Sequence, residues 1–277
     1  MPHTHKQRLK TYRMTIAYDG TSFHGWQTQP NGLSIQQLIE EALLRLIKIP
    51  VRIIAAGRTD AGVHALGQVA HFRTDKSLNT KTIFKALNGI LPKDIRILEF
   101  AEAHPNFHAN RSAIKKIYRY SICTESYVMP FEQRYTLHLH KKVDMDLVRQ
   151  AAKLFIGKHD FTSFANVGGG APIEKNPYRT ILRLDVIPTP SGFQLEFEGD
   201  GFFYKMVRNI TGMLLAVGTG RRELKDIKRV FHAKDRKQAE RAVPANGLTL
   251  VKVFYPQDLI NPVNDDDSSA LPESSGS

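Results

Sequence analysis

The chain has 277 residues, of which 42% are hydrophobic, and 39 Lys and Arg against 27 Asp and Glu give it a net charge of +12. This composition predicts a globular protein of one large or two small domains, and the positive charge favours a polyanionic partner such as nucleic acid. The single cysteine, Cys123, excludes an intramolecular disulfide and a cysteine-based zinc cluster. No apolar run of about 18 residues is present and none follows the basic N-terminus, so we expect a cytoplasmic protein without membrane span or secretory signal.

The first expected segment is a basic N-terminal arm over residues 1–12, which hold no acid. An alternating run predicts a strand at 13–18, and Ser34 followed by Gln37 predicts a capping box that opens a helix. That helix has one apolar stripe at i, i+3, i+4 and i+7 spacing, formed by Ile35, Leu38, Ile39, Ala42, Leu43 and Leu46. Two strands, a helix and a further strand complete a β-α-β-β-α-β order, at 51–56, 68–73, 81–91 and 95–101.

The same order of elements recurs loosely from Lys115 onward. A strand, a helix, two strands and two helices precede a late strand, at 116–123, 145–156, 179–187, 193–199, 203–217, 223–233 and 248–254. We therefore expect an α/β (α+β) fold of two ferredoxin-like βαββαβ halves, residues 13–113 and 114–256, packed as one unit with a central antiparallel or mixed sheet and a cleft. The polar, acidic residues 257–277 are expected to form a disordered tail.

The glycine-rich loop Gly57–Gly67, with the sequence GRTDAGVHALG, is the most informative stretch. It places one carboxylate, Asp60, near Arg58 and next to a glycine hinge, at the junction of two expected strands. Its three glycines permit backbone angles that other residues avoid. An aspartate in such a loop is commonly an Asx-turn residue in solvent, and a reactive carboxylate is the alternative.

A helix in the second half offers this carboxylate a partner. Residues 206–217 are apolar around most of the helix, and Arg208 is the one charge among them. A buried arginine is destabilising unless a carboxylate pairs with it. We therefore expect Arg208 to pair with Asp60 and to fix its oxygens, whereas an arginine exposed at the start of a helix is the alternative.

The segment Gly57–Ala65 resembles the signature loop of the tRNA pseudouridine synthase A (TruA) family. Six further segments resemble family blocks in family order, namely YDGTSFHGWQ at 18–27, FHA at 107–109, KIYRY at 116–120, DFTSF at 160–164, MVRNI at 206–210 and GLTL at 247–250. The resemblance implies a pseudouridine-synthase-type fold and an isomerase, without metal or small-molecule cofactor, that converts uridine to pseudouridine in tRNA. It also implies targets at positions 38, 39 and 40 of the anticodon stem-loop, and a homodimer that grips one tRNA across both subunits.

The resemblance also implies roles for individual residues, with Asp60 as the catalytic nucleophile and Arg208 as its partner. Tyr118 is the active-site tyrosine that packs on the target base, although its position on an alternating strand face with Tyr120 and Ile122 usually indicates core or cross-strand packing. Arg58 fills the space that the base leaves. The other expected substrate-binding residues are Leu248, Gln27, Phe107, His108 and Trp26. Trp26 could equally be a core residue.

Several other patterns suggest a metal site or a phosphate-binding loop, but these signals are weaker. The pairs His104/His108 and His138/His140 lack a carboxylate arranged like a metal site, and Gly168–Gly170 lacks the lysine and the helix of a P-loop, which favours RNA contact by this loop. Two rival classes are a non-catalytic RNA-binding protein and an N-ribosyl hydrolase that releases uracil, and product analysis separates them. Three routes are open to Asp60: attack at C1′, attack at C6, or removal of the 2′ proton.

Overall fold

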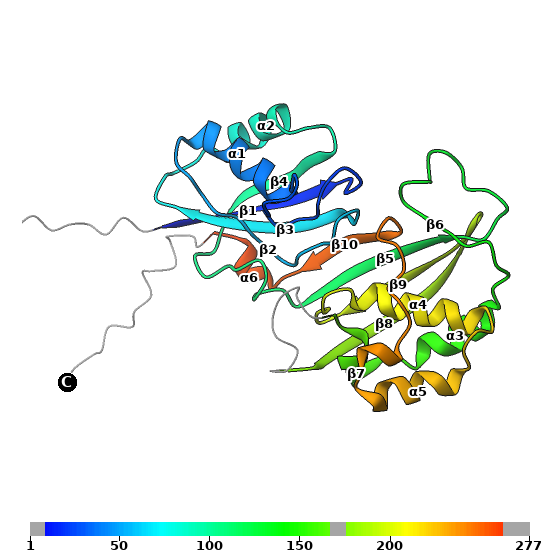
Figure 1. Cartoon of the computed structure of the whole chain (residues 1–277). Coiled ribbons are helices and arrows are strands. Elements are labelled where there is room, and N and C mark those ends of the chain that lie inside the picture. Colours follow the sequence, from blue (N-terminus) through cyan, green and yellow to red (C-terminus); the bar gives the residue numbers. More distant parts are fainter. Residues whose placement is uncertain (1–8, 167–175, 263–277) are drawn as a thin grey trace, which may run out of the picture.

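The computed structural model describes residues 9–166 and 176–262 of the chain (Figure 1). The first half contains β1 (Lys10–Tyr18), α1 (Ile35–Ile47), β2 (Ile54–Ala55), β3 (His64–Thr74), α2 (Thr80–Ile90) and β4 (Ile95–Ala103). The second half contains β5 (Lys115–Cys123), β6 (Leu137–His138), α3 (Met145–Lys153), β7 (Gly157–Asp160), β8 (Tyr178–Thr189), β9 (Gly192–Gly199), α4 (Met206–Gly218), α5 (Leu224–Ala233), β10 (Leu248–Phe254) and α6 (Gln257–Ile260). The expected βαββαβ order is therefore present in both halves, and β6, β7, α5 and α6 are additions to it.

The strands of both halves form one sheet, in the order β4-β1-β3-β10-β5-β9-β8-β7, with β2 beside β3 and β6 beside β5. The last strand, β10, joins the halves because it pairs in parallel with β3 and antiparallel with β5. The close approach of β10 to β3 requires a glycine, since a Cβ at Gly67 would lie 2.6 Å from the carbonyl oxygen of Val251. The expected α/β (α+β) fold with a central mixed sheet is confirmed.

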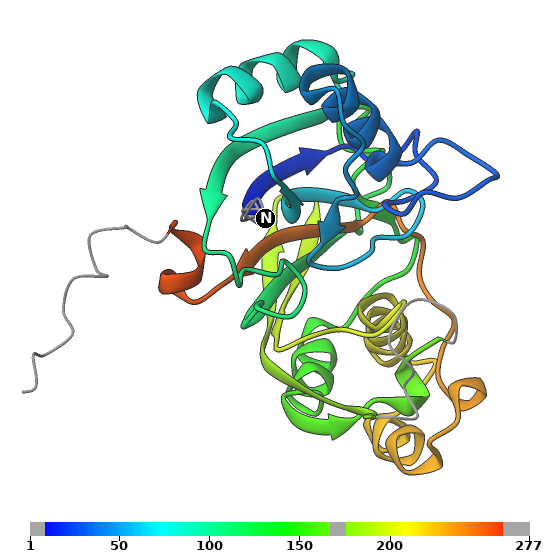
Figure 2. The ribbon, with the colours of Figure 1, turned by 90° about the vertical axis from the view of Figure 1, so that its left-hand side faces the viewer.

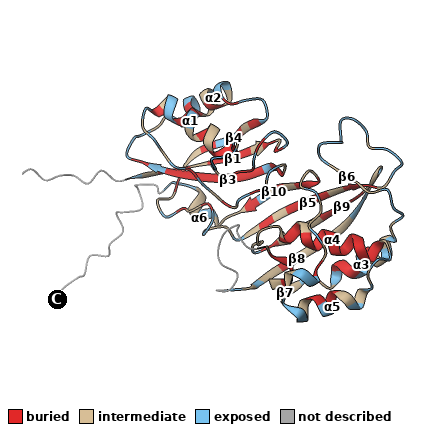
Figure 3. Cartoon of the chain, viewed as in Figure 1, coloured by how far each residue is buried: buried red, intermediate tan, exposed pale blue. Residues whose placement is uncertain are grey.

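The helices form two groups, one for each half of the sheet. In Figures 1 and 2, α1 and α2 lie together beside β1, β3 and β4, whereas α3, α4 and α5 lie together beside the strands of the second half. Buried residues run along the strands and cover most of α4 (Figure 3), and one hydrophobic core includes residues of both halves. Within the described parts of the chain, no helix has the length and apolar character needed to cross a membrane.

The expected strand at 51–56 is wrong in length, because β2 spans only Ile54–Ala55. Side chains of α1 take the backbone groups that a longer strand would use. The carboxylate of Glu40 accepts a hydrogen bond from the backbone N–H of Ile53 (2.9 Å), and the Gln36 amide donates to the Ile53 carbonyl (3.4 Å). Apolar and β-branched composition alone does not reveal this competition.

Two helix starts also differ from expectation. Ser34 caps α1 by accepting from the Gln37 N–H (3.2 Å), but the Gln37 side chain donates to Glu41 (2.9 Å), so only half of the expected capping box forms. Helix α4 begins at Met206 rather than at 203, because Lys205 takes the left-handed conformation with φ 59°. At its other end α4 reaches Gly218, whereas α3 ends at Lys153 instead of 156.

The folded body starts earlier than expected. Strand β1 begins at Lys10, inside the expected basic arm 1–12, and pairs with β3 from that residue onward. Thr11 and Tyr12 are fully buried. The expected boundary of the arm at residue 12 is therefore wrong, and residues 1–8 of the arm lie outside the described residues.

The folded body also ends later than expected. Helix α6 occupies the start of the expected tail, 257–277, and its last carbonyl groups are bound to the first half. The Leu259 carbonyl accepts from the His104 N–H (3.2 Å), and the Ile260 carbonyl accepts from Nε of Arg13 (3.0 Å). Residues 263–277 and the loop at Gly168–Gly170 lie outside the described residues.

Candidate active site

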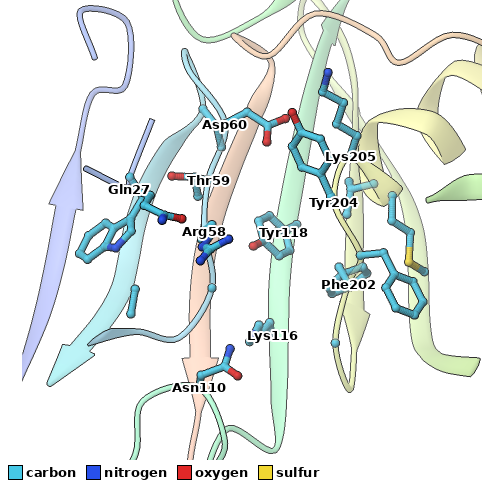
Figure 4. A pocket seen from close by; sticks show the side chains of 18 of the residues that line it. Gln27, Arg58, Thr59, Asp60, Asn110, Lys116, Tyr118, Phe202, Tyr204 and Lys205 are labelled. Carbon is cyan, nitrogen blue, oxygen red and sulfur yellow. The ribbon is translucent and has the colours of Figure 1, made fainter. Parts of the chain in front are cut away.

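A cavity of about 1600 Å³ is lined by residues from both halves of the chain (Figure 4). Eight of the nine expected site residues line it, namely Trp26, Gln27, Arg58, Asp60, His108, Tyr118, Arg208 and Leu248. Among the described residues that line it, the carboxylates are Asp60 and Asp200, whereas the cations are Arg52, Arg58, Arg111, Lys116, Arg179, Lys205 and Arg208. This excess of positive charge suits a polyanionic ligand.

The loop that carries Asp60 is held mainly through its backbone. The Thr59 carbonyl accepts from the Trp26 N–H (3.0 Å), and the Asp60 carbonyl closes a turn by accepting from the Val63 N–H (3.1 Å). Gly25 permits this packing, because it has a φ of +86° and a Cβ there would lie 2.6 Å from the Thr59 carbonyl oxygen. The loop thus fixes where the Asp60 side chain starts.

The orientation of the Asp60 carboxylate comes from the second half. Nη1 of Arg208 donates to Oδ2 of Asp60, and the two side chains are only 12% and 18% exposed. Nε of Arg208 donates to the Val243 carbonyl (2.8 Å), which holds the guanidinium plane. The predicted ion pair is therefore confirmed, and the alternatives of a solvent-exposed Asp60 and a surface Arg208 are excluded.

Tyr118 lies on β5, and its ring forms part of the cavity wall while only 8% of the residue is exposed. It packs edge-on against Phe202, with 5.2 Å between ring centroids. The expected alternation is confirmed, because Tyr120 and Ile122 are buried on the same face of β5. Burial, with smaller contributions from Tyr18 and Asp60, raises the pKa of Tyr118 well above its ordinary value, so its hydroxyl is protonated at neutral pH.

Four further expected substrate-binding residues also line the cavity. Arg58 is exposed beside Tyr118 (Figure 4), Gln27 and His108 are half-buried, and Leu248 is the buried first residue of β10. They come from four separate segments of the chain. The fold therefore brings Arg58, Gln27, His108 and Leu248 to one surface together with Asp60.

The structure does not place Trp26 and Phe107 in the same way. Trp26 borders the cavity but is 2% exposed and packs near the ring of Tyr18, so of the two alternatives it is a core residue. Phe107 is fully buried and packs on Tyr255, with 4.9 Å between ring centroids. It does not line the cavity, which its neighbour His108 reaches. The expected contact of Phe107 with substrate therefore has no support in its position.

Sequence reasoning missed several cavity residues, among them Lys116, Arg179 and Phe202. Lys116 precedes Tyr118 by two positions on β5, and Arg179 and Phe202 come from β8 and from the segment before α4. The alternation that groups Tyr118 with Tyr120 extends to Lys116, so that signal was available. Arg179 and Phe202 had no comparable signal, because their place depends on how the second half folds back.

Three of the four histidines in the two expected pairs form hydrogen bonds with backbone groups. Nδ1 of His104 accepts from the Asn106 N–H (3.0 Å), and Nδ1 of His108 accepts from the Asn110 N–H (3.2 Å). Nε2 of His138 bonds to the Glu125 carbonyl (2.9 Å). Across the residues that the structure describes, no group of three or more His, Cys, Asp or Glu is arranged to hold a metal ion.

A carboxylate and an arginine from the two halves are paired beside a buried tyrosine in a basic cavity, which is the arrangement that the resemblance to pseudouridine synthases implies. A family model described as tRNA pseudouridine synthase matches residues 14–111 and 151–256. The chain is 49% identical over 248 residues to tRNA pseudouridine synthase A 1 of Protochlamydia amoebophila, covering 89% of this chain and 97% of that protein.

Two further relatives are named tRNA pseudouridine synthase A. That of Chlamydia pneumoniae is 43% identical, covering 87% of this chain and 91% of the relative, and that of Latilactobacillus sakei is 40% identical, covering 88% and 98%. The chain belongs to the tRNA pseudouridine synthase A (TruA) family, and it is an isomerase that forms pseudouridine in tRNA. Family membership excludes the two rival classes, the RNA-binding protein without catalysis and the hydrolase.

Proposed function

We propose that the enzyme isomerises uridines 38, 39 and 40 in the anticodon stem-loop of tRNA, with Asp60 as the catalytic nucleophile. The observation that carries the proposal is the Asp60–Arg208 ion pair, because it aims one carboxylate into a basic cavity beside Tyr118. Among the described lining residues, Asp60 is the carboxylate held by a guanidinium, whereas Asp200 accepts from the backbone N–H of Thr180 (2.9 Å).

The reaction breaks the bond between ribose C1′ and N1 of the base and forms a bond from C1′ to C5. N1 gains a proton and C5 loses one, so atoms and electrons balance without an oxidant or a reductant. Asp60 supplies an electron pair that adds to the nucleotide and leaves when the new bond forms. Arg208 contributes by holding the carboxylate oxygens in one orientation.

The other cavity residues bind the substrate in this proposal. The ring of Tyr118 packs on the target base, and Arg58 fills the space that the base vacates in the RNA. Gln27, His108 and Leu248 contact the nucleotide from the remaining walls. The backbone N–H of Trp26 supports the Asp60 loop by donating to the Thr59 carbonyl, and Phe107 has a packing role.

Nucleoside mapping of an unmodified tRNA transcript tests the positions and the nucleophile together. Uridines at 38, 39 and 40 are offered singly, with cytidine at the other two, and the wild type and Asp60→Asn are compared. We expect pseudouridine at each of the three positions with the wild type and none with the variant. Product only at other positions would contradict the assigned targets, and product with Asp60→Asn would contradict the assigned nucleophile.

We also propose that the enzyme works as a cytoplasmic homodimer, as the family resemblance implies. Apolar side chains on the segment between β5 and β6 support a protein partner, because Phe131 is 88% exposed and Tyr127 and Met129 are also exposed. Sedimentation velocity measures the oligomeric state. A dimer that dissociates in the Phe131→Ser variant is expected, and a monomeric wild type at micromolar concentration would contradict the homodimer.

A further inference from the structure

A buried ammonium group lies in the cavity in addition to the residues of the proposed chemistry. Lys116 is 9% exposed and shares the inward face of β5 with Tyr118. Figure 4 shows it on the same strand as Tyr118, with Asn110 beside it. Its Nζ donates to the Ala56 carbonyl (2.7 Å), which leaves two of its three N–H groups for other partners.

Within the described part of the chain, no carboxylate lies within ion-pair distance of this ammonium. Of the two acids that line the cavity, Asp60 is paired with Arg208 and Asp200 is bound to the backbone of Thr180. Burying a cation without an opposite charge is unfavourable. An anion that enters the cavity would supply the missing charge.

The same cavity holds a second cation, Arg179. The guanidinium of Arg179 stacks on the ring of Phe203, 3.9 Å from its centroid, and lines the same cavity. Burial first, and then the charge of Arg179, lower the pKa of Lys116 to about 8. Two cations that disfavour each other in one cavity become favourable when an anion binds between them.

The ammonium is also held in a fixed position at the start of the Gly57–Gly67 loop. The Ala56 carbonyl accepts both from Lys116 and from Nδ2 of Asn110, and Gly57 follows it directly. A Cβ at Gly57 would lie 3.4 Å from the ammonium nitrogen and 3.9 Å from the Tyr118 hydroxyl. The glycine therefore leaves the ammonium open toward the space beside Tyr118. If Lys116 only had to bind the Ala56 carbonyl, the neutral amide of Asn110 would suffice.

We propose that Lys116 and Arg179 form a phosphate subsite, which binds a non-bridging oxygen of the RNA backbone phosphate that flanks the target uridine. This inference rests on the proposed function, because a uridine packed on Tyr118 and reached by Asp60 has a flanking phosphate on the same side of the cavity. The subsite would hold the backbone while the base is out of its stack, and it recognises charge rather than sequence.

The test removes the charge of one phosphate at a time. The uridine that the wild type modifies is first located by nucleoside mapping, so an error in the assigned positions does not affect the result. Synthetic tRNA then carries one methylphosphonate, either 5′ or 3′ of that uridine, and single-turnover rates are measured at subsaturating enzyme. The variants are Lys116→Met and Arg179→Met, with the exposed Lys93→Met as the matched control.

We expect Lys116→Met to lower the rate on unmodified RNA about 10- to 100-fold, with Lys93→Met unchanged. At one of the two linkages the methylphosphonate should lower the wild-type rate by a similar factor and lower the rate of Lys116→Met no further. The salt dependence of binding should also become shallower by about 0.7 for the variant. Losses that multiply at both linkages would overturn the proposal, because Lys116 would then act independently of the phosphates.

The wild type alone gives a second measurement that does not depend on how a variant folds. The phosphate binds the protonated ammonium, so the methylphosphonate penalty should be full below pH 8 and shrink as the pH rises above it. A penalty that is absent at both linkages, or that does not change between pH 7 and pH 9, would also overturn the subsite. Either failure leaves pseudouridine formation itself, and thus the proposed function, untouched.

Discussion

The two halves of the molecule contribute to the site in different ways. The first half supplies the carboxylate of Asp60, the proposed nucleophile, from a loop that is fixed through backbone contacts, such as that from the Trp26 N–H to the Thr59 carbonyl. The second half supplies Arg208, Tyr118 and Lys116 from a helix and a strand whose inward faces are buried. A loop fixes a backbone but leaves a carboxylate free to rotate, whereas a buried helix and strand fix whole side chains. The first half alone would therefore not fix the orientation of the Asp60 carboxylate.

The contact between the halves is polar at the site and apolar around it. Strand β10 links the two parts of the sheet, and the residues before it hold two side chains of the second half. The Val243 carbonyl accepts from Arg208, and the Pro244 carbonyl accepts from the Tyr120 hydroxyl (2.8 Å). The orientation of the guanidinium thus depends on the same segment that closes the sheet. Substitutions on either side of the Asp60–Arg208 pair test these separate contributions of the two halves.

Asp60→Asn should have the largest effect, because it removes the carboxylate that is proposed to act as the nucleophile. We expect turnover to fall by at least about a thousandfold. Affinity for tRNA should change little, because contacts with phosphates over the basic surface supply most of it. Rapid-quench single-turnover assays and filter binding measure the two quantities. A variant that loses affinity as strongly as turnover would show that Asp60 holds the tRNA instead of acting on it.

The ion pair itself is tested by a double-mutant cycle on the free energy of unfolding. Asp60→Ala leaves the Arg208 cation in an apolar helix, at a cost of about 3 kcal/mol, the lower end for a buried pair because both side chains are slightly exposed. Arg208→Met should cost less, and the double variant less than the sum of the singles. Chemical denaturation gives the three values. Additivity within about 0.5 kcal/mol would mean that the pair does not couple the halves.

Substitutions of Tyr118 test what the buried strand β5 contributes to RNA binding. If its ring packs on the base, Tyr118→Leu should weaken the binding of a tRNA that contains the target uridine by about 1–3 kcal/mol. Tyr118→Phe keeps the ring and should bind like the wild type, which makes it the matched control. Equal losses in the two variants would indicate that the hydroxyl, not the ring, carries the contact.

The sequence predicted the parts of the site that depend on one segment each. Asp60 lies in a recognisable loop, and a lone charge in an apolar helix indicates a buried partner, so the pair with Arg208 could be predicted from chemistry as well as from resemblance. Lys116 was missed although it shares the period of Tyr118, because alternation gives the face of a residue but not the groups opposite to it. Phe107 was predicted wrongly for the opposite reason. The segment FHA at 107–109 matches the family, but the match does not show that its phenylalanine is buried and that only its histidine reaches the cavity.

The fold shows the same limit of sequence reasoning. The order of elements follows from periodicity within each segment, and it was predicted in both halves. The ends of β2 and α4 were not, because Glu40 binds the backbone of Ile53 and Lys205 takes a left-handed conformation. The position of β10 between β3 and β5 depends on the small size of Gly67, which has meaning only once its neighbour is known.

The smallest expected effect lies at a second contact between the halves, away from the chemistry. The Tyr135 hydroxyl donates to Oδ2 of Asp19 (2.9 Å), while Oδ1 of Asp19 accepts from the hydroxyl of Thr21 (2.6 Å). Asp19 immediately precedes Gly20, whose N–H donates to Nδ1 of His64 in the signature loop (3.0 Å). The contact therefore links the segment after β5 to the loop that carries Asp60.

Removing this hydrogen bond should have a pH-dependent effect. Burial alone would raise the pKa of Asp19, but hydrogen bonds from Thr21 and Tyr135 outweigh burial and lower it below its ordinary 3.8. A carboxyl with a depressed folded-state pKa stabilises the fold above its unfolded-state pKa, and this stabilisation is lost as the pH falls through the folded-state value. Tyr135→Phe should thus lower the free energy of unfolding by about 0.5 kcal/mol at pH 7, because Tyr135 is partly exposed, and by less near pH 3. Chemical denaturation at the two pH values measures the difference, and a loss that is equal at both would mean that Tyr135 stabilises the contact by packing and not through Asp19.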